Sequence, residues 1–400
     1  MKSSQSNTTR QAKQYGMSNK AGRHWDVFCR IVDNFGDIGV CWRLSQQLAH
    51  EHHQQVRLFI DNLAIASKII PTLNPELPSQ TINSVEICTW PNTDDDIKPA
   101  DVALETFSCE LPASYLETMQ TSTSWVNLEY LSAEPWVADF HARSSNNTKV
   151  TRHFFFPGFT DATGGLIRET DIFQKNQKLA NSYSHQCDFL QSLNLVHDDA
   201  LKISLFCYPH APIPSLLNAM AESNQRIHCY VPIGNILPKI AEYFGVDSPQ
   251  LNTIQTGAKF SHKNLNVTIL PFLSQSDYDK LLVICDINFV RGEDSWVRAI
   301  WAAKPFIWQP YLQTENTHIT KLNAFLDLFY SSCDETPKHT VYEAHSAWVA
   351  DNMTIPVWQN YLNNLPVIKR FTLQQANQLA EQTDLAAKLV IFLQKLSVKV

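Results

Sequence analysis

Short apolar runs alternate with helix-like segments along most of the chain, and this alternation limits the fold more than any other feature. The run at 25–32 is strand-like and is followed by the glycine-containing segment DNFGDIG at 33–39. Residues 40–49 then place apolar side chains at helical spacing, and the run at 56–60 has the composition of a second strand. This order predicts a βαβ unit, and its repetition predicts a parallel sheet with helices on both faces.

The alternation forms two series, which predicts two α/β domains with a cleft between them. Runs at 85–90, 102–104 and 125–128 continue the first series. The second series starts with a strand at 201–207 and a helix at 214–221, and has further strands or buried runs at 227–231, 265–270 and 282–290. We expect a disordered polar tail at 1–23, Rossmann-like lobes at 24–180 and 181–372, and C-terminal helices at 373–400 that could pack back on the first lobe.

Composition excludes several classes of protein. The net charge of −7 over 400 residues shows no basic excess, which argues against direct nucleic-acid binding. No apolar run is long enough to span a membrane, and the polar N-terminus lacks a secretory signal. The nine cysteines are odd in number and contain no CxxC pair, which favours reduced thiols. We therefore expect a cytoplasmic protein without a membrane partner.

Two carboxylates flank the first glycine loop. Asp33 and Asp37 follow a predicted strand, and Gly36 and Gly39 let the backbone approach a ligand. One carboxylate could act as a general base. Alternatively, Asp37 caps the following helix, and local chemistry alone favours this second interpretation. The glycine spacing does not match GxGxxG, so a dinucleotide-binding fingerprint is not supported.

A second loop, RGEDS at 291–295, also lies between a predicted strand and a helix-like stretch. A helix N-terminus presents free N–H groups and suits a diphosphate, and Arg291 adds a forked cation. Glu293 and Asp294 would then bind sugar hydroxyls or orient Arg291. A capped helix with an Arg–Glu surface pair explains the same residues about equally well.

Aromatic and polar residues near other strand ends are candidates for nucleobase contacts. Phe206 and Tyr208 could stack on a base, and Gln275 and Tyr278 lie in another loop after a strand. Such rings more often pack in a core.

Two acidic or histidine-rich groups could be read as metal sites. The triplet at 94–96 formally matches a DxD metal clamp, but its polar surroundings favour a solvated loop. His50, His52 and His53 fit a helix C-terminus better than a metal site. No G-x-S-x-G nucleophile elbow is present.

Three long motifs together resemble one known family. These are DNFGDIGVCWR at 33–43, NFVRGEDS at 288–295 and WAAKPFIWQ at 301–309, and the likeness extends from about residue 25 to the C-terminus. They resemble EarP, the bacterial protein-arginine rhamnosyltransferases that modify translation elongation factor P. The resemblance implies a GT-B fold, with two Rossmann-like lobes facing a central cleft. It implies metal-independent, inverting transfer of L-rhamnose from dTDP-β-L-rhamnose to an arginine of elongation factor P, which activates that factor to relieve ribosome stalling.

The resemblance also implies roles for individual residues. Asp33, Asp37 and Glu293 would be catalytic, with Asp37 favoured as the base. The donor would be bound by Asn34, Phe35, Gly36, Phe206, Tyr208, Gln275, Tyr278, Arg291, Gly292, Glu293, Asp294 and Ser295. Two alternatives remain open: a non-catalytic nucleotide-sugar-binding module of the same shape, and a GT-B transferase or epimerase acting on a glycan or small molecule.

Overall fold

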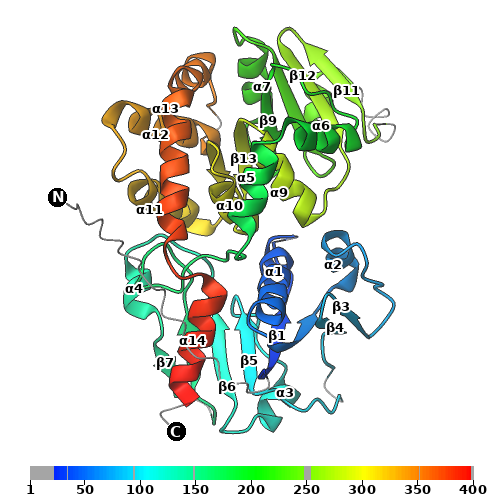
Figure 1. The fold of residues 1–400 in the computed structure, drawn as a ribbon, viewed down its shortest axis with the longest axis vertical. Coiled ribbons are helices and arrows are strands. Elements are labelled where there is room, and N and C mark those ends of the chain that lie inside the picture. Colours follow the sequence, from blue (N-terminus) through cyan, green and yellow to red (C-terminus); the bar gives the residue numbers. More distant parts are fainter. Residues whose placement is uncertain are drawn as a thin grey trace, which may run out of the picture.

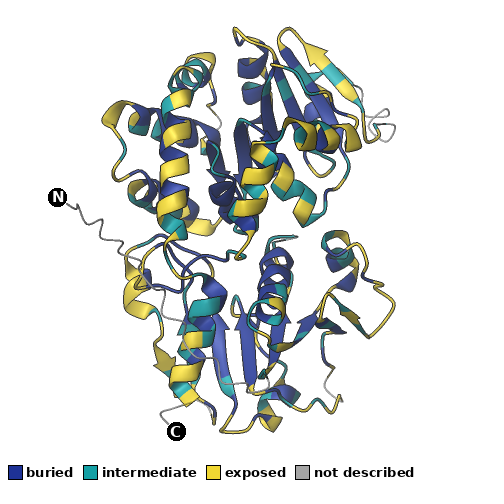
Figure 2. Ribbon diagram, in the orientation of Figure 1, coloured by how far each residue is buried: buried dark blue, intermediate teal, exposed yellow. Residues whose placement is uncertain are grey.

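A computed structural model describes residues 22–33, 35–92, 95–146, 149–246, 254–350 and 352–397. Figure 1 shows two lobes stacked along the long axis, each built around its own sheet. The core of each lobe lies at its sheet, and exposed residues concentrate on the outer faces of the helices (Figure 2).

The first lobe contains an eight-stranded sheet in the order β3-β4-β2-β1-β5-β6-β8-β7. Its elements are β1 (His24–Cys29), α1 (Gly36–His50), β2 (Gln55–Ile60), α2 (Leu63–Ile69), β3 (Ser79–Ile82), β4 (Val85–Thr89), β5 (Val102–Thr106), α3 (Ala113–Thr118), β6 (Ser124–Leu128), α4 (Trp136–Phe140), β7 (Ser144–Ser145) and β8 (Arg152–Phe155). The six central strands are parallel, and β3 and β7 add antiparallel edges. Counted along the chain, the parallel strands follow the Rossmann order 3-2-1-4-5-6.

The second lobe contains a six-stranded sheet in the order β11-β12-β10-β9-β13-β14. Its strands are β9 (Leu201–Leu205), β10 (Ile227–Pro232), β11 (Lys259–His262), β12 (Leu265–Leu270), β13 (Ile287–Arg291) and β14 (Phe306–Gln309), and all but β11 pair in parallel. Its helices are α5 (Ile172–Ala180), α6 (Tyr183–Ser192), α7 (Ile213–Ala221), α8 (Leu237–Tyr243), α9 (Gln275–Ile284), α10 (Asp294–Ala302), η2 (Thr314–Asn316), α11 (Thr317–Phe329), α12 (Glu335–Val349) and α13 (Ile355–Ala380). Two Rossmann-like lobes are the GT-B arrangement, so the predicted fold class is confirmed.

The central strands are apolar because both of their faces are covered. In β1, every residue except the first is buried, and Val27 pairs with Leu58 of β2 and Leu104 of β5. A strand covered on both faces is mostly apolar rather than alternating, and the buried Asp26 of β1 is paired with Arg57 of β2. This requirement is why the apolar runs of the sequence located most of the strands.

The structure refines one predicted element and differs from two others. The apolar run at 282–290 is a buried run rather than one strand, because α9 continues to Ile284 and β13 begins only at Ile287. Helix α5 falls within the 24–180 range expected for the first lobe, yet it packs against α9 and α10. The helical region expected from 373 starts earlier, since α13 spans Ile355–Ala380.

The last helix returns to the first lobe. After α13, the chain crosses the lobe boundary and forms α14 (Leu385–Ser397), which lies beside the first sheet in Figure 1. The Leu385 amide donates to the Leu166 carbonyl oxygen at 2.9 Å, and the Phe392 ring lies 5.5 Å from that of Phe155. The two ends of the described chain are therefore both in the first lobe.

Two further features bear on the class of protein. All nine cysteines have free thiols. Among the residues described, no helix combines the length and apolar character that a membrane crossing requires. Residues 1–21, which include most of the tail expected to be disordered, lie outside the described residues.

Candidate active site

Each sheet brings two loops to the point where its strand order reverses. In the first lobe these loops follow β1 and β5, and in the second they follow β9 and β13. Ligands of open α/β sheets bind at such switch points, outside the carboxyl ends of the strands. The predicted loops at 33–37 and 291–295 follow β1 and β13, so topology places both at ligand-binding positions.

The two loops are in direct contact through Asp33. Its Oδ2 accepts a hydrogen bond from the Tyr208 hydroxyl of the second lobe at 2.5 Å. Gly292 adopts a φ of +59°, and a Cβ there would lie 3.0 Å from the same Asp33 oxygen and 3.1 Å from the Tyr208 hydroxyl oxygen. Only glycine fits this position without strain and without displacing the contact. Burial raises the pKa of Asp33, although Tyr208 and Arg291 oppose the rise.

Asp37 lies in the first turn of α1 and stabilises its own loop. Its Oδ2 accepts hydrogen bonds from the Val32 and Asp33 amides at 2.7 and 2.8 Å. The residue at the N-cap position is Phe35, whose side chain makes no capping bond. Asp37 therefore binds amides that precede the helix rather than those of its first turn, which differs from the capping interpretation. Burial raises its pKa, the two amides lower it, and the charge of Asp33 raises it further.

Glu293 contributes a third carboxylate, from the second lobe. Its Oε1 accepts a hydrogen bond from the Leu131 amide of the first lobe at 2.8 Å. Burial raises the pKa of Glu293 well above its usual range, Lys321 opposes this, and Asp37 and Asp33 reinforce it. The carboxylates of Asp33, Asp37 and Glu293 line one cavity of about 260 Å³, which we call the carboxylate cavity. Its other walls are Val32, Gly36, Val40, Phe107, Tyr130, Leu131, Gly292, Trp308, Pro310, Tyr311, Gln313 and Lys321.

A larger cavity of about 610 Å³ adjoins the carboxylate cavity and shares Asp33, Gly36 and Gly292 with it. We call it the donor cavity, after the sugar-nucleotide donor whose expected binding residues line it. The first lobe contributes Asp33, Phe35, Gly36, Lys68, Ile69 and Pro71. The second contributes Phe206, Cys207, Pro232, Ile233, Gly234, Asn235, Ile236, Phe272, Leu273, Gln275, Tyr278, Arg291, Gly292, Asp294 and Ser295. Both lobes therefore form its walls.

Aromatic rings in and beside the donor cavity pack against Arg291 and against one another. The Arg291 guanidinium carbon lies 4.4 Å from the centre of the Phe206 ring and 4.6 Å from that of Tyr208, so two rings hold this cation. Phe206 also packs against Tyr278 at 5.4 Å. Across the lobe boundary, Phe35 packs edge-on against Phe272 at 4.9 Å.

The polar wall of the donor cavity is formed by the first turns of α9 and α10. Gln275 donates through Nε2 to the Gly39 carbonyl oxygen at 3.0 Å and to Asp294 Oδ2 at 3.1 Å. Ser295 closes the turn before α10, because its Oγ accepts from the Arg291 amide at 3.0 Å and donates to the Arg291 carbonyl oxygen. The hydroxyl of Ser295 therefore shapes the loop.

Most of the predicted site residues meet in these two cavities. The exceptions are Tyr208, which lines neither cavity and instead bridges Arg291 and Asp33, and Asn34, which lies outside the described residues. The prediction missed Phe107 and Tyr130, whose rings stack at 4.4 Å in the carboxylate cavity, and it missed Lys321. Phe107 directly follows β5, so the switch-point rule would have indicated it.

The residues considered for a metal do not form a cluster in the described structure. Of the triplet at 94–96, Asp94 lies outside the described residues. Across the described ranges, no group of three or more histidine, cysteine, aspartate or glutamate side chains is arranged to hold a metal ion.

Comparisons with known proteins agree with this geometry. A family model described as Elongation-Factor P (EF-P) rhamnosyltransferase EarP matches residues 25–394. The protein-arginine rhamnosyltransferase of Pseudomonas aeruginosa is 38% identical over 373 residues, which cover 92% of this chain and 98% of the relative. That of Shewanella oneidensis is 36% identical, covering 93% and 98%.

A solved structure agrees as well. It is described as the structural basis for EarP-mediated arginine glycosylation of translation elongation factor EF-P. It superposes with a TM-score of 0.67 at 30% identity, over 93% of this chain and 99% of the other. On these matches and this fold, the chain belongs to the EarP family of EF-P rhamnosyltransferases.

Proposed function

We propose that this protein transfers L-rhamnose from dTDP-β-L-rhamnose to an arginine side chain of translation elongation factor P in the cytoplasm, with inversion at the sugar and without a metal. The observation that carries the proposal is the junction of the two cavities. A site with aromatic rings and a cation adjoins a site with three carboxylates, and the two share Asp33, Gly36 and Gly292. A sugar at this junction would have its leaving group on one side and its acceptor on the other.

The donor cavity has the groups that a nucleoside diphosphate sugar needs. Arg291 and the N-terminus of α10 would bind the diphosphate, since a helix N-terminus and a guanidinium both favour anionic oxygens. The nucleobase would lie towards the apolar part of the cavity near Ile233 and Phe272. Gln275 and Asp294 would face the sugar hydroxyls.

The carboxylate cavity suits a guanidinium acceptor. An arginine side chain keeps its positive charge in proteins, because its pKa exceeds about 12. Asp33 and Asp37 supply negative charge in a partly desolvated space, where its attraction to a cation is stronger than in water, and Glu293 adds a third carboxyl group beside them. The stacked rings of Phe107 and Tyr130 add faces against which a planar guanidinium can pack.

The reaction would be one displacement. A guanidinium nitrogen attacks the anomeric carbon, a C–N bond forms, and the bond from that carbon to the diphosphate oxygen breaks. Asp37 accepts the proton that the nitrogen loses as the new bond forms, because a carboxylate cannot deprotonate a free guanidinium beforehand. Arg291 stabilises the charge that develops on the diphosphate. Proximity in the closed site supplies part of the acceleration.

Mass spectrometry of the acceptor tests the proposal. Elongation factor P incubated with this protein and dTDP-β-L-rhamnose should gain one deoxyhexose on a single arginine, and the gain should persist in EDTA. Elongation factor P with that arginine changed to lysine should gain none. A protein that binds the donor but never modifies the acceptor would be the non-catalytic alternative. Modification of a glycan or small molecule in place of elongation factor P would support the second alternative, a GT-B transferase or epimerase with another substrate.

A further inference from the structure

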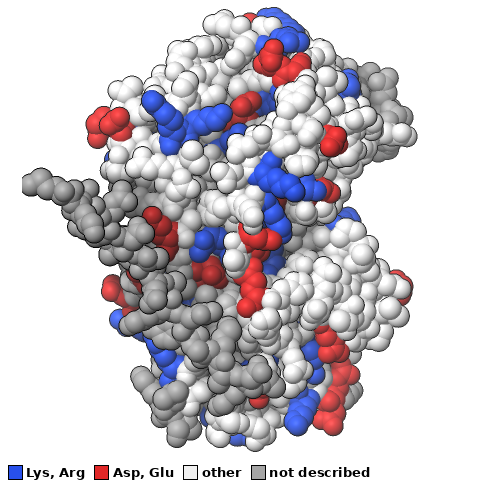
Figure 3. Space-filling model, in the orientation of Figure 1, with Lys and Arg blue, Asp and Glu red and all other residues white. Residues whose placement is uncertain are grey.

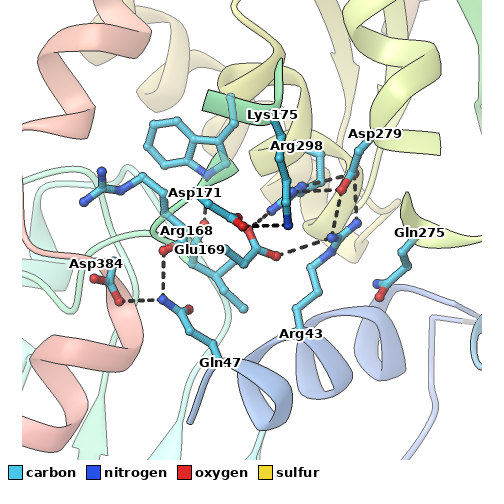
Figure 4. Close-up of polar contacts among 12 residues, drawn as sticks. Arg43, Gln47, Arg168, Glu169, Asp171, Lys175, Gln275, Asp279, Arg298 and Asp384 are labelled. Atoms are coloured by element: carbon cyan, nitrogen blue, oxygen red, sulfur yellow. Dashed lines mark hydrogen bonds and ion pairs between the residues drawn. The ribbon is translucent and has the colours of Figure 1, made fainter. Parts of the chain in front are cut away.

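Arg43 is a buried cation of the first lobe, and its ion-pair partners lie in the second lobe and in the connection between the lobes. It projects from α1, and its side chain is 6% exposed. Its Nε donates to Asp294 Oδ1 at 2.7 Å, and its two terminal nitrogens form a fork with Asp279 at 3.0 and 2.9 Å. Glu169, in the connection between the lobes, lies 3.5 Å from its Nη1. Figure 4 shows Arg43 reaching from α1 to Asp279 and Glu169.

Asp294 connects Arg43 to the donor cavity. One oxygen of Asp294 accepts from Arg43, and the other accepts from Gln275 at 3.1 Å. Both Asp294 and Gln275 line the donor cavity, whereas Arg43 does not. Arg43 therefore fixes one end of a chain of hydrogen bonds whose other members form the polar wall of that cavity.

A second arginine in the same cluster provides a natural comparison. Arg298 of α10 is 4% exposed, and it also forms a fork with Asp279, at 3.1 and 2.8 Å. Its Nη1 donates to Glu169 Oε2 at 2.5 Å. Among the described residues, its ion pairs are those with Asp279 and Glu169, so it matches Arg43 in burial and in two partners but does not pair with Asp294.

The cluster favours the charged form of Glu169 and joins residues of the two lobes. Burial opposes the charge of Glu169, but Arg298 and Arg43 outweigh it and lower the pKa of this carboxyl to about 2. Two arginines, Arg43 of α1 and Arg298 of α10, thus face three carboxylates: Glu169 in the connection between the lobes, Asp279 of α9 and Asp294 of α10. Figure 3 shows basic and acidic side chains side by side along the junction of the lobes. If the lobes separated, Arg43 would lose Asp279 and Asp294 together.

We propose that Arg43 is a positioning residue for the sugar-nucleotide donor. It acts through Asp294 and holds the polar wall of the donor cavity in its binding position only while the lobes are closed. This inference rests on the proposed use of a nucleotide-sugar donor. Comparing the two arginines distinguishes this positioning role from a purely structural one. Both arginines belong to the same buried ion-pair cluster, but of the two only Arg43 contacts Asp294.

Two matched variants test this role. Arg43→Lys and Arg298→Lys each replace a fork by a single ammonium in an equally buried place. Steady-state transfer is measured with the KM for dTDP-β-L-rhamnose, the KM for elongation factor P and kcat determined separately, together with Tm. We expect Arg43→Lys to raise the donor KM by about tenfold, the scale of one lost charged hydrogen bond, with the acceptor KM unchanged. Arg298→Lys should lower Tm comparably and leave the donor KM within about twofold.

The proposal is overturned if both variants change the donor KM equally, or if Arg43→Lys leaves it unchanged. Should Arg43→Lys be too unstable to assay, Arg43→Gln is measured with the same expectation. A double variant adds a second criterion. If Arg43 acts through Asp294, Arg43→Lys combined with Asp294→Asn should have the same donor KM as Asp294→Asn alone. If the increases in donor KM of the two single variants multiply in the double variant, the two residues act independently and the proposal is wrong. Transfer by the wild-type protein tests the proposed function separately. If the wild type transfers no rhamnose from dTDP-β-L-rhamnose, the proposed function is refuted before any variant is compared.

Discussion

At the scale of single residues, charge is divided between the two cavities. The donor cavity has Arg291 held between Phe206 and Tyr208, and the carboxylate cavity has Asp37 and Glu293. Asp33 belongs to both, and its hydrogen bond from Tyr208 joins the lobes where they meet. In the proposed reaction, this division would place the anionic leaving group and the cationic acceptor in separate sites of opposite charge.

Replacing Arg291 should weaken nucleotide binding. In Arg291→Ala, a diphosphate bound as proposed would lose charged hydrogen bonds worth about 1.5–3 kcal/mol, so the Kd for dTDP should rise roughly ten- to a hundredfold. Isothermal titration calorimetry with dTDP measures this directly. Lys321→Ala serves as the control, because Lys321 is a nearby cation that lines only the carboxylate cavity. Unchanged dTDP affinity in Arg291→Ala would remove its role at the diphosphate.

At the scale of elements, the approach of α1 to the second lobe depends on a small residue. Gly39 lies in the first turns of α1, and a Cβ there would lie 3.2 Å from both Asp294 Oδ2 and Gln275 Nε2. The Gly39 carbonyl oxygen also accepts the hydrogen bond from Gln275. This one position of the helix therefore sets how closely the lobes approach beside the donor cavity.

Gly39→Ala should separate stability from activity. Alanine favours a helix interior over glycine by about 1 kcal/mol, so the Tm should not fall. The added methyl would push against Asp294 and Gln275, and kcat/KM for the donor should fall on the order of ten- to a hundredfold. Gln46→Ala, on the same helix and outside both cavities, should leave kcat/KM unchanged. Full activity in Gly39→Ala would show that the lobes tolerate a wider gap.

The sequence located elements well where burial dictates a pattern. Mostly apolar runs identified β1, β2 and β10, although they contain Asp26, Arg57 and His228 respectively, because strands covered on both faces have little other choice of residue. The run at 282–290 is buried as expected but is divided between the end of α9 and β13, since a buried helix end and a buried strand have the same apolar composition. The paired loops at 33–37 and 291–295 were found because glycine and acidic residues interrupt the apolar pattern after a strand.

Other parts of the site could not be predicted from local sequence. Arg43 lies between Trp42 and Leu44 in an apolar stretch, and nothing nearby indicates that its partners are at 279 and 294. Tyr130 and Lys321 reach the carboxylate cavity through the arrangement of two lobes, which local periodicity does not encode. The contact between Tyr208 and Asp33 likewise joins residues 175 positions apart.

At the scale of the whole molecule, the last helix belongs to the lobe that contains the start of the chain. Helix α14 packs on the first lobe through Leu389 and Leu393, which are 0% and 1% exposed, and through Phe392 against Phe155. The chain therefore crosses the lobe boundary twice, once before α5 and once after α13. Two crossings restrict the relative motions of the lobes more than one would.

Leu389→Ala tests whether α14 is part of the first lobe's core. The lost side chain and the cavity that it leaves should cost about 2–5 kcal/mol, so the Tm should fall. Ile391→Ala is the matched control on the same helix, since Ile391 is 44% exposed and should change the Tm little. Equal Tm values for the two variants, measured by differential scanning calorimetry, would place α14 outside the core.

If carboxylates beside the donor cavity carry out transfer, Asp37→Asn should abolish it and leave nucleotide binding intact. Asparagine can still accept hydrogen bonds from the Val32 and Asp33 amides, so the loop should keep its shape, but it cannot accept the proton from the acceptor. Asp37 does not line the donor cavity. Rhamnose transfer to elongation factor P is measured alongside the Kd for dTDP. We predict that transfer falls by about 10²–10⁴-fold while the Kd stays within about twofold of wild type. Transfer at the wild-type rate would show that Asp37 is not the base.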